Sequence, residues 1–107
     1  MLTMEHFYLA LDYSLKTTPQ ARAVQSRQIC LRIIMDGKSY CPITFVAQVH
    51  QLGDYGDQPG LAYAAGQRLQ MPDKTIRRVI DGADNFGAPG VRQRLTAILR
   101  PYIKEEL

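Results

Sequence analysis

The sequence has few of the residues on which several protein classes depend. It contains no tryptophan, only two cysteines, and six Tyr and three Phe among 107 residues. Two cysteines form at most one disulfide, which excludes the small secreted domains that a disulfide framework holds together. With so few aromatic residues, the core must consist mainly of Leu, Ile, Val, Ala and Met. This composition favours packed helices over a sandwich of aromatic-rich strands.

Long apolar runs and a basic N-terminal flank are also lacking. The apolar run at residues 7–11, which no other run exceeds, is far shorter than the roughly 20 residues of a membrane-spanning helix. No Lys or Arg precedes Lys16, so the basic flank of a signal peptide is missing. We therefore expect a cytoplasmic protein that does not enter a membrane, with Cys30 and Cys41 as free thiols.

What is present fits one folded domain over residues 1–107. Hydrophobic residues make up 46% and charged residues 21% of the chain, which is typical of folded rather than disordered proteins. The length suffices for a single core. A loop-like stretch at 54–60, rich in Gly, Asp and Pro, separates a predicted helical half at 1–53, with a role in dimerisation, from a second half at 60–105.

Apolar periodicity predicts helices in the first half. A stripe with three-to-four spacing runs through 3–16, with Thr3 as the N-cap. A second helix is expected from Thr18-Pro19 to Asp36-Gly37. The alternative for part of this segment is a β-hairpin at 29–45, with Asp36-Gly37 as its turn. We prefer the helix, because Pro42 weakens the return strand and residues 21–28 favour helix.

The rest of the chain is also expected to be helical. Helices are predicted from Pro42 to Leu52, over 61–69, from Asp73 to Ile80 with Gly82 as the stop, and from Val91 to Leu99. The predicted fold class is therefore all-α, a single domain of five to six short helices. The hairpin at 29–45 is the only departure that we consider.

Charge is distributed unevenly along the chain, although the net charge is only +3. Residues 39–66 carry two acids and no Lys or Arg, whereas six basic residues lie between 74 and 100, with only Asp81 and Asp84 as acids. Nine of the thirteen basic residues are arginine. The planar guanidinium suits bidentate contact with phosphate or guanine, so the C-terminal third is the candidate for polyanion contact.

The most specific stretch is 65–82, which combines small, apolar and basic positions in a fixed order. A small pair is followed by two apolar residues that flank a tight turn, then by a break at Met71-Pro72, and then by two apolar anchors. These positions are Ala65, Gly66, Leu69, Met71, Ile76 and Val79. The pattern resembles the prokaryotic helix-turn-helix of LacI-type and phage repressors. At the turn position that glycine usually holds, this chain has Gln70, which would need a positive φ.

The resemblance implies a DNA-binding domain whose second helix enters the major groove. With Ile76, Val79 and Ile80 turned inward, the basic residues of that helix are left outside, and Asp73 is placed as the helix cap. The predicted DNA contacts, to base edges or phosphates, are Arg68, Asp73, Lys74, Thr75, Arg77, Arg78, Arg92 and Arg94. The predicted function is a small sequence-specific transcriptional regulator that binds double-stranded DNA as a homodimer, because one short helix provides little specificity.

The alternative function is a helical protein-binding inhibitor or anti-activator, of the kind encoded by phages or mobile elements, that touches a protein partner and no DNA. No enzyme signature, cofactor motif or metal motif is found. Cys30, Cys41 and His50 lack the spacing of a metal site. Asp36-Gly37-Lys38-Ser39 lacks the earlier glycine of a phosphate-binding loop, because Arg32 stands there.

Overall fold

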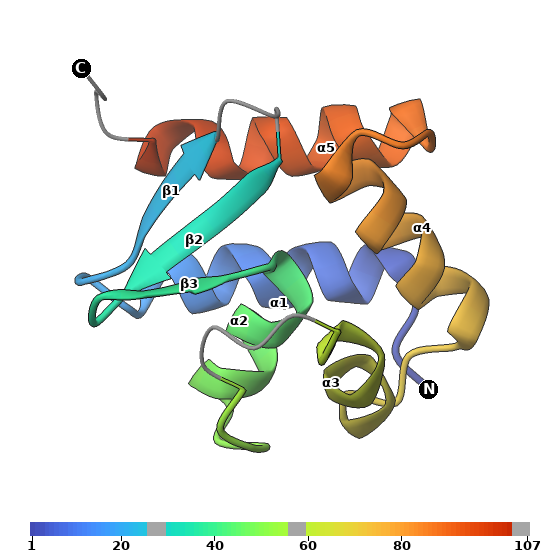
Figure 1. Ribbon diagram of the computed structural model, residues 1–107, viewed down its shortest axis with the longest axis horizontal. Helices are drawn as coiled ribbons and strands as arrows, with labels where there is room; N and C mark the ends of the chain where they lie inside the picture. Colours follow the sequence, from blue (N-terminus) through green and yellow to red (C-terminus); the bar gives the residue numbers. More distant parts are fainter. Residues whose placement is uncertain (26–29, 56–59, 104–107) are drawn as a thin grey trace.

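The computed structural model describes residues 1–25, 30–55 and 60–103 (Figure 1). Within these ranges the chain forms five α-helices, three strands and one turn of 3₁₀ helix. The elements are α1 (Met4–Lys16), β1 (Arg22–Gln25), β2 (Leu31–Met35), β3 (Lys38–Tyr40), α2 (Pro42–Val49), α3 (Ala62–Arg68), α4 (Asp73–Asp84), α5 (Pro89–Leu99) and η1 (Arg100–Tyr102).

Local signals account for the ends of the first two helices. The Thr3 side chain accepts a hydrogen bond from the His6 amide at 3.1 Å, so the predicted N-cap of α1 is confirmed. Proline is the first residue of α2, where its missing N–H leaves no intrahelical bond unmade. α2 ends earlier than predicted, at Val49 rather than Leu52. Gln51, with φ 60°, already has left-handed geometry there.

The three strands form an antiparallel sheet in the order β1-β2-β3. Met35 pairs with Lys38, which leaves Asp36 and Gly37 as a two-residue turn. Both turn residues have positive φ, 54° and 78°, as a type I′ hairpin turn requires. The side chains of β2 alternate between buried and half-buried positions, so one face of the sheet packs on the core and the other lies nearer to solvent.

The prediction of an all-α fold is therefore wrong. The helix expected from Thr18 to Asp36-Gly37 does not form over 22–25 and 31–35, which are strands; residues 26–29 lie outside the described residues. The hairpin alternative is confirmed for 31–40, but its extension to residue 45 is not, because residues 42–49 form α2. Pro42 does not weaken the return strand, since β3 ends at Tyr40, ahead of the proline.

α1 runs through the middle of the molecule, with α2 and α5 packed against it (Figure 1). α5 covers one side of α1 and α2 covers another. The sheet lies toward one end of the molecule and α4 toward the other, and α4 also contacts β2. Side chains with no exposed surface join these layers, among them Phe7, Leu11, Ile33, Phe45 and Leu95. Beyond η1, Ile103 forms a parallel bridge with Ala23 and so adds to the outer edge of β1.

Candidate nucleic-acid interface

α3 and α4 are joined by a four-residue turn that holds them in close contact. A β-carbon on Gly66 would lie 2.6 Å from Cγ1 and Cδ1 of Ile76, so only glycine permits this approach without movement of the isoleucine. Gln70 has φ 62°, which confirms the positive φ expected at this position. The Met71 amide donates to the Gly66 oxygen at 2.9 Å, and the Leu2 amide donates to the Gln70 oxygen at 2.9 Å. The turn is therefore tied to both α3 and the N-terminal segment.

α4 is strongly amphipathic. Ile76 and Val79 are fully buried, and Ala83 is nearly so, whereas Lys74 and Arg78 are exposed on the other side of the helix. The burial expected for the two apolar anchors of the motif is thus confirmed. The helix is held by α3 on one flank and by α5 on another, which leaves its basic side chains on the surface.

Both predicted ends of this helix need correction. Asp73 is the first helical residue rather than the cap; the capping position is Pro72, which has no side chain that can accept a hydrogen bond. Gly82 does not stop the helix, which continues to Asp84 and ends with Asn85 in the left-handed conformation. Gly82 instead provides space, because a β-carbon there would lie 2.9 Å from Cγ1 of Val91 on α5.

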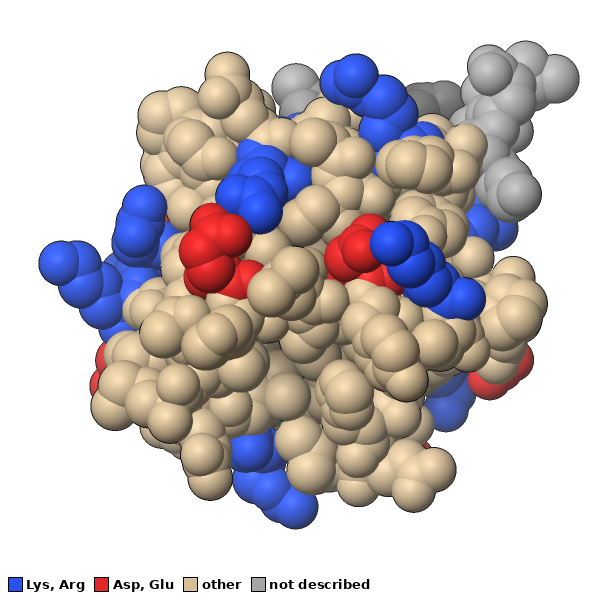
Figure 2. Space-filling model, turned by 180° about the vertical axis from the view of Figure 1, so that it is seen from behind, with Lys and Arg blue, Asp and Glu red and all other residues tan. Residues whose placement is uncertain are grey.

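Most of the eight predicted DNA contacts lie on one part of the surface. Five are exposed, at the end of α3 and in the first half of α4: Arg68, Asp73, Lys74, Arg77 and Arg78. Thr75 is half-buried beside them. Figure 2 shows Lys and Arg side chains together at the left edge of the face opposite to that of Figure 1, the side on which α4 lies. The end of α3 and the first half of α4 thus present basic groups to solvent.

The other two predicted contacts, Arg92 and Arg94 of α5, are engaged within the chain. Nη1 of Arg92 donates to the backbone oxygens of Gly82 and Ala83, at 3.1 and 2.9 Å, and so caps the end of α4. Arg94 forms a bidentate ion pair with Glu5, with both N–O distances at 3.0 Å, and its guanidinium lies 4.6 Å from the centre of the Tyr8 ring. Both arginines therefore hold elements together.

The basic residues of α4 differ in how far they are restrained. Nε of Arg77 donates to the Tyr63 hydroxyl on α3 at 2.9 Å, and this bond raises the pKa of Arg77, which stays charged. Lys74 and Arg78, like Arg68 on α3, have no ion-pair or hydrogen-bond partner within the described ranges. Their charges are therefore available to an external anion.

Three functional partners were missed by the sequence reasoning. Tyr63 lies 14 residues before Arg77, and Glu5 lies 89 residues before Arg94; the third partner is Tyr8, beneath the Arg94 guanidinium. No local pattern links such pairs, because packing of distant segments creates them.

No protein-family model, curated protein or solved structure matches this chain. The resemblance of 65–82 to a helix-turn-helix thus depends on the residues themselves. Cys30 and Cys41 are both half-buried, and they are not joined in a disulfide. Among the described residues, no three His, Cys, Asp or Glu side chains are grouped closely enough to hold a metal ion. Nor does any helix in those ranges have the length and apolar character that crossing a membrane demands.

Proposed function

We propose that the protein is a small sequence-specific DNA-binding transcriptional regulator that inserts α4 into the major groove. The observation that carries the proposal is that Lys74 and Arg78 are exposed and have no ion-pair or hydrogen-bond partner among the described residues, on a helix whose opposite face is buried. Gly66 and Gln70 support it, because they permit the close approach and the tight turn that a helix-turn-helix needs.

The set of proposed DNA contacts is smaller than the set of eight predicted from the sequence. Lys74, at the start of α4, would meet base edges, and Arg78, one turn further on, would meet bases or the groove wall. Arg68 at the end of α3 would contact phosphate. Arg77 would approach the DNA already oriented by Tyr63. A phosphate contact by Arg92 or Arg94 would require loss of the bonds that each makes now.

A homodimer belongs to this proposal for a physical reason. α4 has 12 residues, and the first turns of one such helix reach only a few base pairs. Two copies that bind half-sites one DNA turn apart would combine their base contacts and gain specificity. We therefore expect a two-fold symmetric DNA site.

A salt titration of duplex binding tests the proposal. The chain is titrated against a fluorescent mixed-sequence duplex of about 20 base pairs at several salt concentrations, and the logarithm of the affinity is plotted against that of the salt concentration. Lys74→Ala and Arg78→Ala should each weaken binding, and Arg68→Ala, which removes the proposed phosphate contact, should reduce the slope by about 1. Selection of preferred duplexes from a random pool then tests sequence specificity.

The matched control is Lys38→Ala. Lys38 is exposed at the start of β3, so the substitution removes the same charge from a distant surface. It should leave both the affinity and the slope nearly unchanged. Affinity that does not fall with added salt, or an equal loss in the Lys38 and Lys74 variants, would contradict the proposal.

The second candidate function is the protein-binding module. It is favoured by Leu9 and Tyr13, which are 62% and 61% exposed and lie four residues apart on one face of α1. Figure 2 also shows a broad area without charged side chains below the middle of the face that it presents. If this candidate is correct, Leu9→Ser together with Tyr13→Ser abolishes activity in the native cell, whereas Lys74→Ala with Arg78→Ala leaves it intact.

A further inference from the structure

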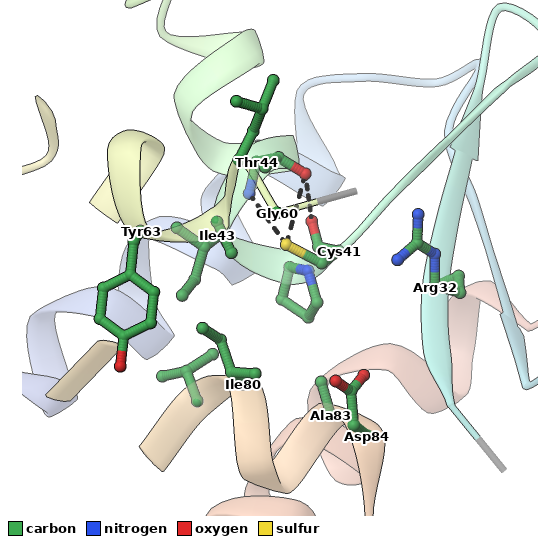
Figure 3. A pocket seen from close by; sticks show the side chains of 13 residues that line it. Arg32, Cys41, Ile43, Thr44, Gly60, Tyr63, Ile80, Ala83 and Asp84 are labelled. Atoms are coloured by element: carbon green, nitrogen blue, oxygen red, sulfur yellow. Dashed lines mark hydrogen bonds between the residues drawn. The ribbon is translucent and has the colours of Figure 1, made fainter. Parts of the chain in front are cut away.

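A cavity of about 270 Å³ lies behind the surface proposed to face DNA. Its walls come from four parts of the chain: β2, the start of α2, residues 60–63 and the second half of α4. Apolar side chains make up most of the lining, including Pro42, Ile43, Leu61, Val79, Ile80 and Ala83 (Figure 3). Such a lining favours an apolar guest, since apolar ligand surface is removed from water there.

Two groups of opposite charge face this apolar space. Figure 3 shows the Arg32 guanidinium pointing into it from β2 and the Asp84 carboxylate pointing into it from the end of α4. Both residues are half-buried. Among the described residues, neither has an ion-pair partner. A cation and an anion thus lie at the same cavity without neutralising each other.

Arg32 is held in place by bonds that leave part of its guanidinium unused. Nε donates to the Ser39 hydroxyl at 2.8 Å and Nη2 donates to the Ser39 backbone oxygen at 3.0 Å, both on β3. Nη1 has no partner within the part of the chain that the structure describes. The side chain is therefore oriented in advance, with donor capacity left for a carboxylate.

The other polar groups near the centre of the cavity already bond to each other. The Thr44 amide donates to Sγ of Cys41 at 3.4 Å, and the Thr44 hydroxyl donates to the Cys41 backbone oxygen at 3.2 Å (Figure 3). Cys41 and Thr44 thus satisfy each other's hydrogen bonds in the cavity wall, and Arg32 and Asp84 carry the charges that a ligand would neutralise.

We infer that this cavity binds a small zwitterion with an apolar side chain, namely an α-amino acid. The ligand carboxylate would accept from Arg32, the ammonium group would donate to Asp84, and the side chain would lie against Ile43 and Ile80. The size agrees, because an apolar cavity of about 150 Å³ accommodates benzene, so 270 Å³ accommodates a side chain of the size of Leu or Phe together with its charged groups.

The inference goes beyond the proposed function and does not depend on it, because ligand binding is measured without DNA. The two are nevertheless neighbours in the structure. Val79, Ile80 and Ala83 of the cavity wall belong to α4, and Tyr63, which also lines the cavity, accepts the hydrogen bond from Arg77. A bound amino acid would therefore contact the helix that we propose reads DNA.

The test is a titration of the ¹⁵N-labelled full chain, followed by NMR, with L-phenylalanine and with L-leucine. Two analogues of phenylalanine separate the charges: 3-phenylpropanoate lacks the ammonium group and 2-phenylethylamine lacks the carboxylate. We expect saturable shifts at Thr44, Ile80 and Ala83 with at least one amino acid, and at least tenfold weaker binding of each analogue.

Two substitutions assign the charged contacts. Asp84→Asn should weaken binding of the amino acid at least tenfold and leave 3-phenylpropanoate unaffected. Arg32→Gln should weaken the amino acid similarly and leave 2-phenylethylamine unaffected. Asp73→Asn and Arg100→Gln are the matched controls, because both residues are exposed and neither lines the cavity; they should bind like the unmodified chain.

The inference is overturned if neither amino acid shifts the cavity resonances at millimolar concentration, or if Asp84→Asn binds as tightly as the unmodified chain. Arg32→Gln removes the bonds to Ser39 and so disturbs the β2–β3 hairpin. If that variant fails to fold, Asp84→Asn still decides the question, because the Asp84 carboxylate has no hydrogen-bond partner within the described residues and its replacement breaks no bond there.

Discussion

The turn between α3 and α4 provides a direct test of the local physics, through the substitution Gln70→Gly. Gln70 has φ 62° and an exposed side chain, so the native protein holds a residue with a β-carbon in left-handed geometry. The hydrogen bonds at this residue join backbone atoms: its amide donates to the Gln67 oxygen, and its oxygen accepts from the Leu2 amide, both at 2.9 Å. Glycine retains these bonds.

The size of the effect follows from two opposing terms. Left-handed geometry costs a residue with a β-carbon about 1–2 kcal/mol, and glycine removes this cost. Glycine also gives the unfolded chain more conformational freedom, which lowers stability by about 0.5–1 kcal/mol. We therefore expect Gln70→Gly to raise the free energy of unfolding by about 0.5–1 kcal/mol, which corresponds to a melting temperature about 4 °C higher.

Urea and thermal unfolding, followed by circular dichroism, measure the change. Gln70→Ala is the first control, because alanine keeps the β-carbon and should produce no gain. Gln67→Gly is the second: Gln67 is exposed within α3, and glycine there should lower stability by about 1 kcal/mol. The reasoning is refuted if Gln70→Gly is no more stable than Gln70→Ala.

Three further predictions concern other contacts. Gly66→Ala should lower the free energy of unfolding by about 1 kcal/mol, because overpacking against Ile76 outweighs the better helix propensity of alanine. In an Ile76→Val background the same substitution should cost less in urea unfolding, and equal losses in the two backgrounds would contradict the packing account. Arg92→Met should lower the free energy of unfolding by about 1–2 kcal/mol, since it leaves two half-buried carbonyl groups without their hydrogen-bond donor. Arg94→Met should cost less, because the ion pair that it removes is exposed. The opposite ranking of the two variants in thermal unfolding would refute this explanation. Burial raises the pKa of Tyr8 above 10.0 in the folded protein, so on raising the pH the unfolded chain loses the Tyr8 proton first. The contribution of Tyr8 to the free energy of unfolding is therefore complete below about pH 10 and is lost as the pH rises through the raised pKa. Tyr8→Phe should therefore reduce the alkaline loss of stability in a pH series of urea titrations, and an unchanged pH profile would exclude this cause.

The elements that could be predicted are those whose signals lie within a few residues. Thr3 caps α1 through the amide three residues later, and Pro42 begins α2. The break at Met71-Pro72 follows from the restriction that proline imposes on the residue before it. The positive φ of Gln70 was expected from the resemblance to a helix-turn-helix, which usually has glycine at that turn position. The alternation of small, apolar and basic positions in 65–82 correctly predicted which side of α4 is buried.

The first half shows where local evidence was misleading. Residues 31–35 alternate like a strand, and Asp36-Gly37 is a strong hairpin signal, but the helical spacing through residues 21–35 competed with both. Packing decided the matter, because Leu31, Ile33 and Met35 bury the same face against the core, together with Ala23 of β1. Pairing with β1 joins positions that no short sequence window compares.

The sequence by itself determined the helices with clear caps, the tight turn before α4 and the basic character of the C-terminal third, because composition and neighbouring residues suffice for each. Only the tertiary structure decided that residues 22–40 form a sheet, that Arg92 and Arg94 are engaged within the chain, and that Arg32 and Asp84 face one cavity. The reason is physical: partners far apart in the chain meet only through the packing of the whole core, and that packing depends on all elements at once.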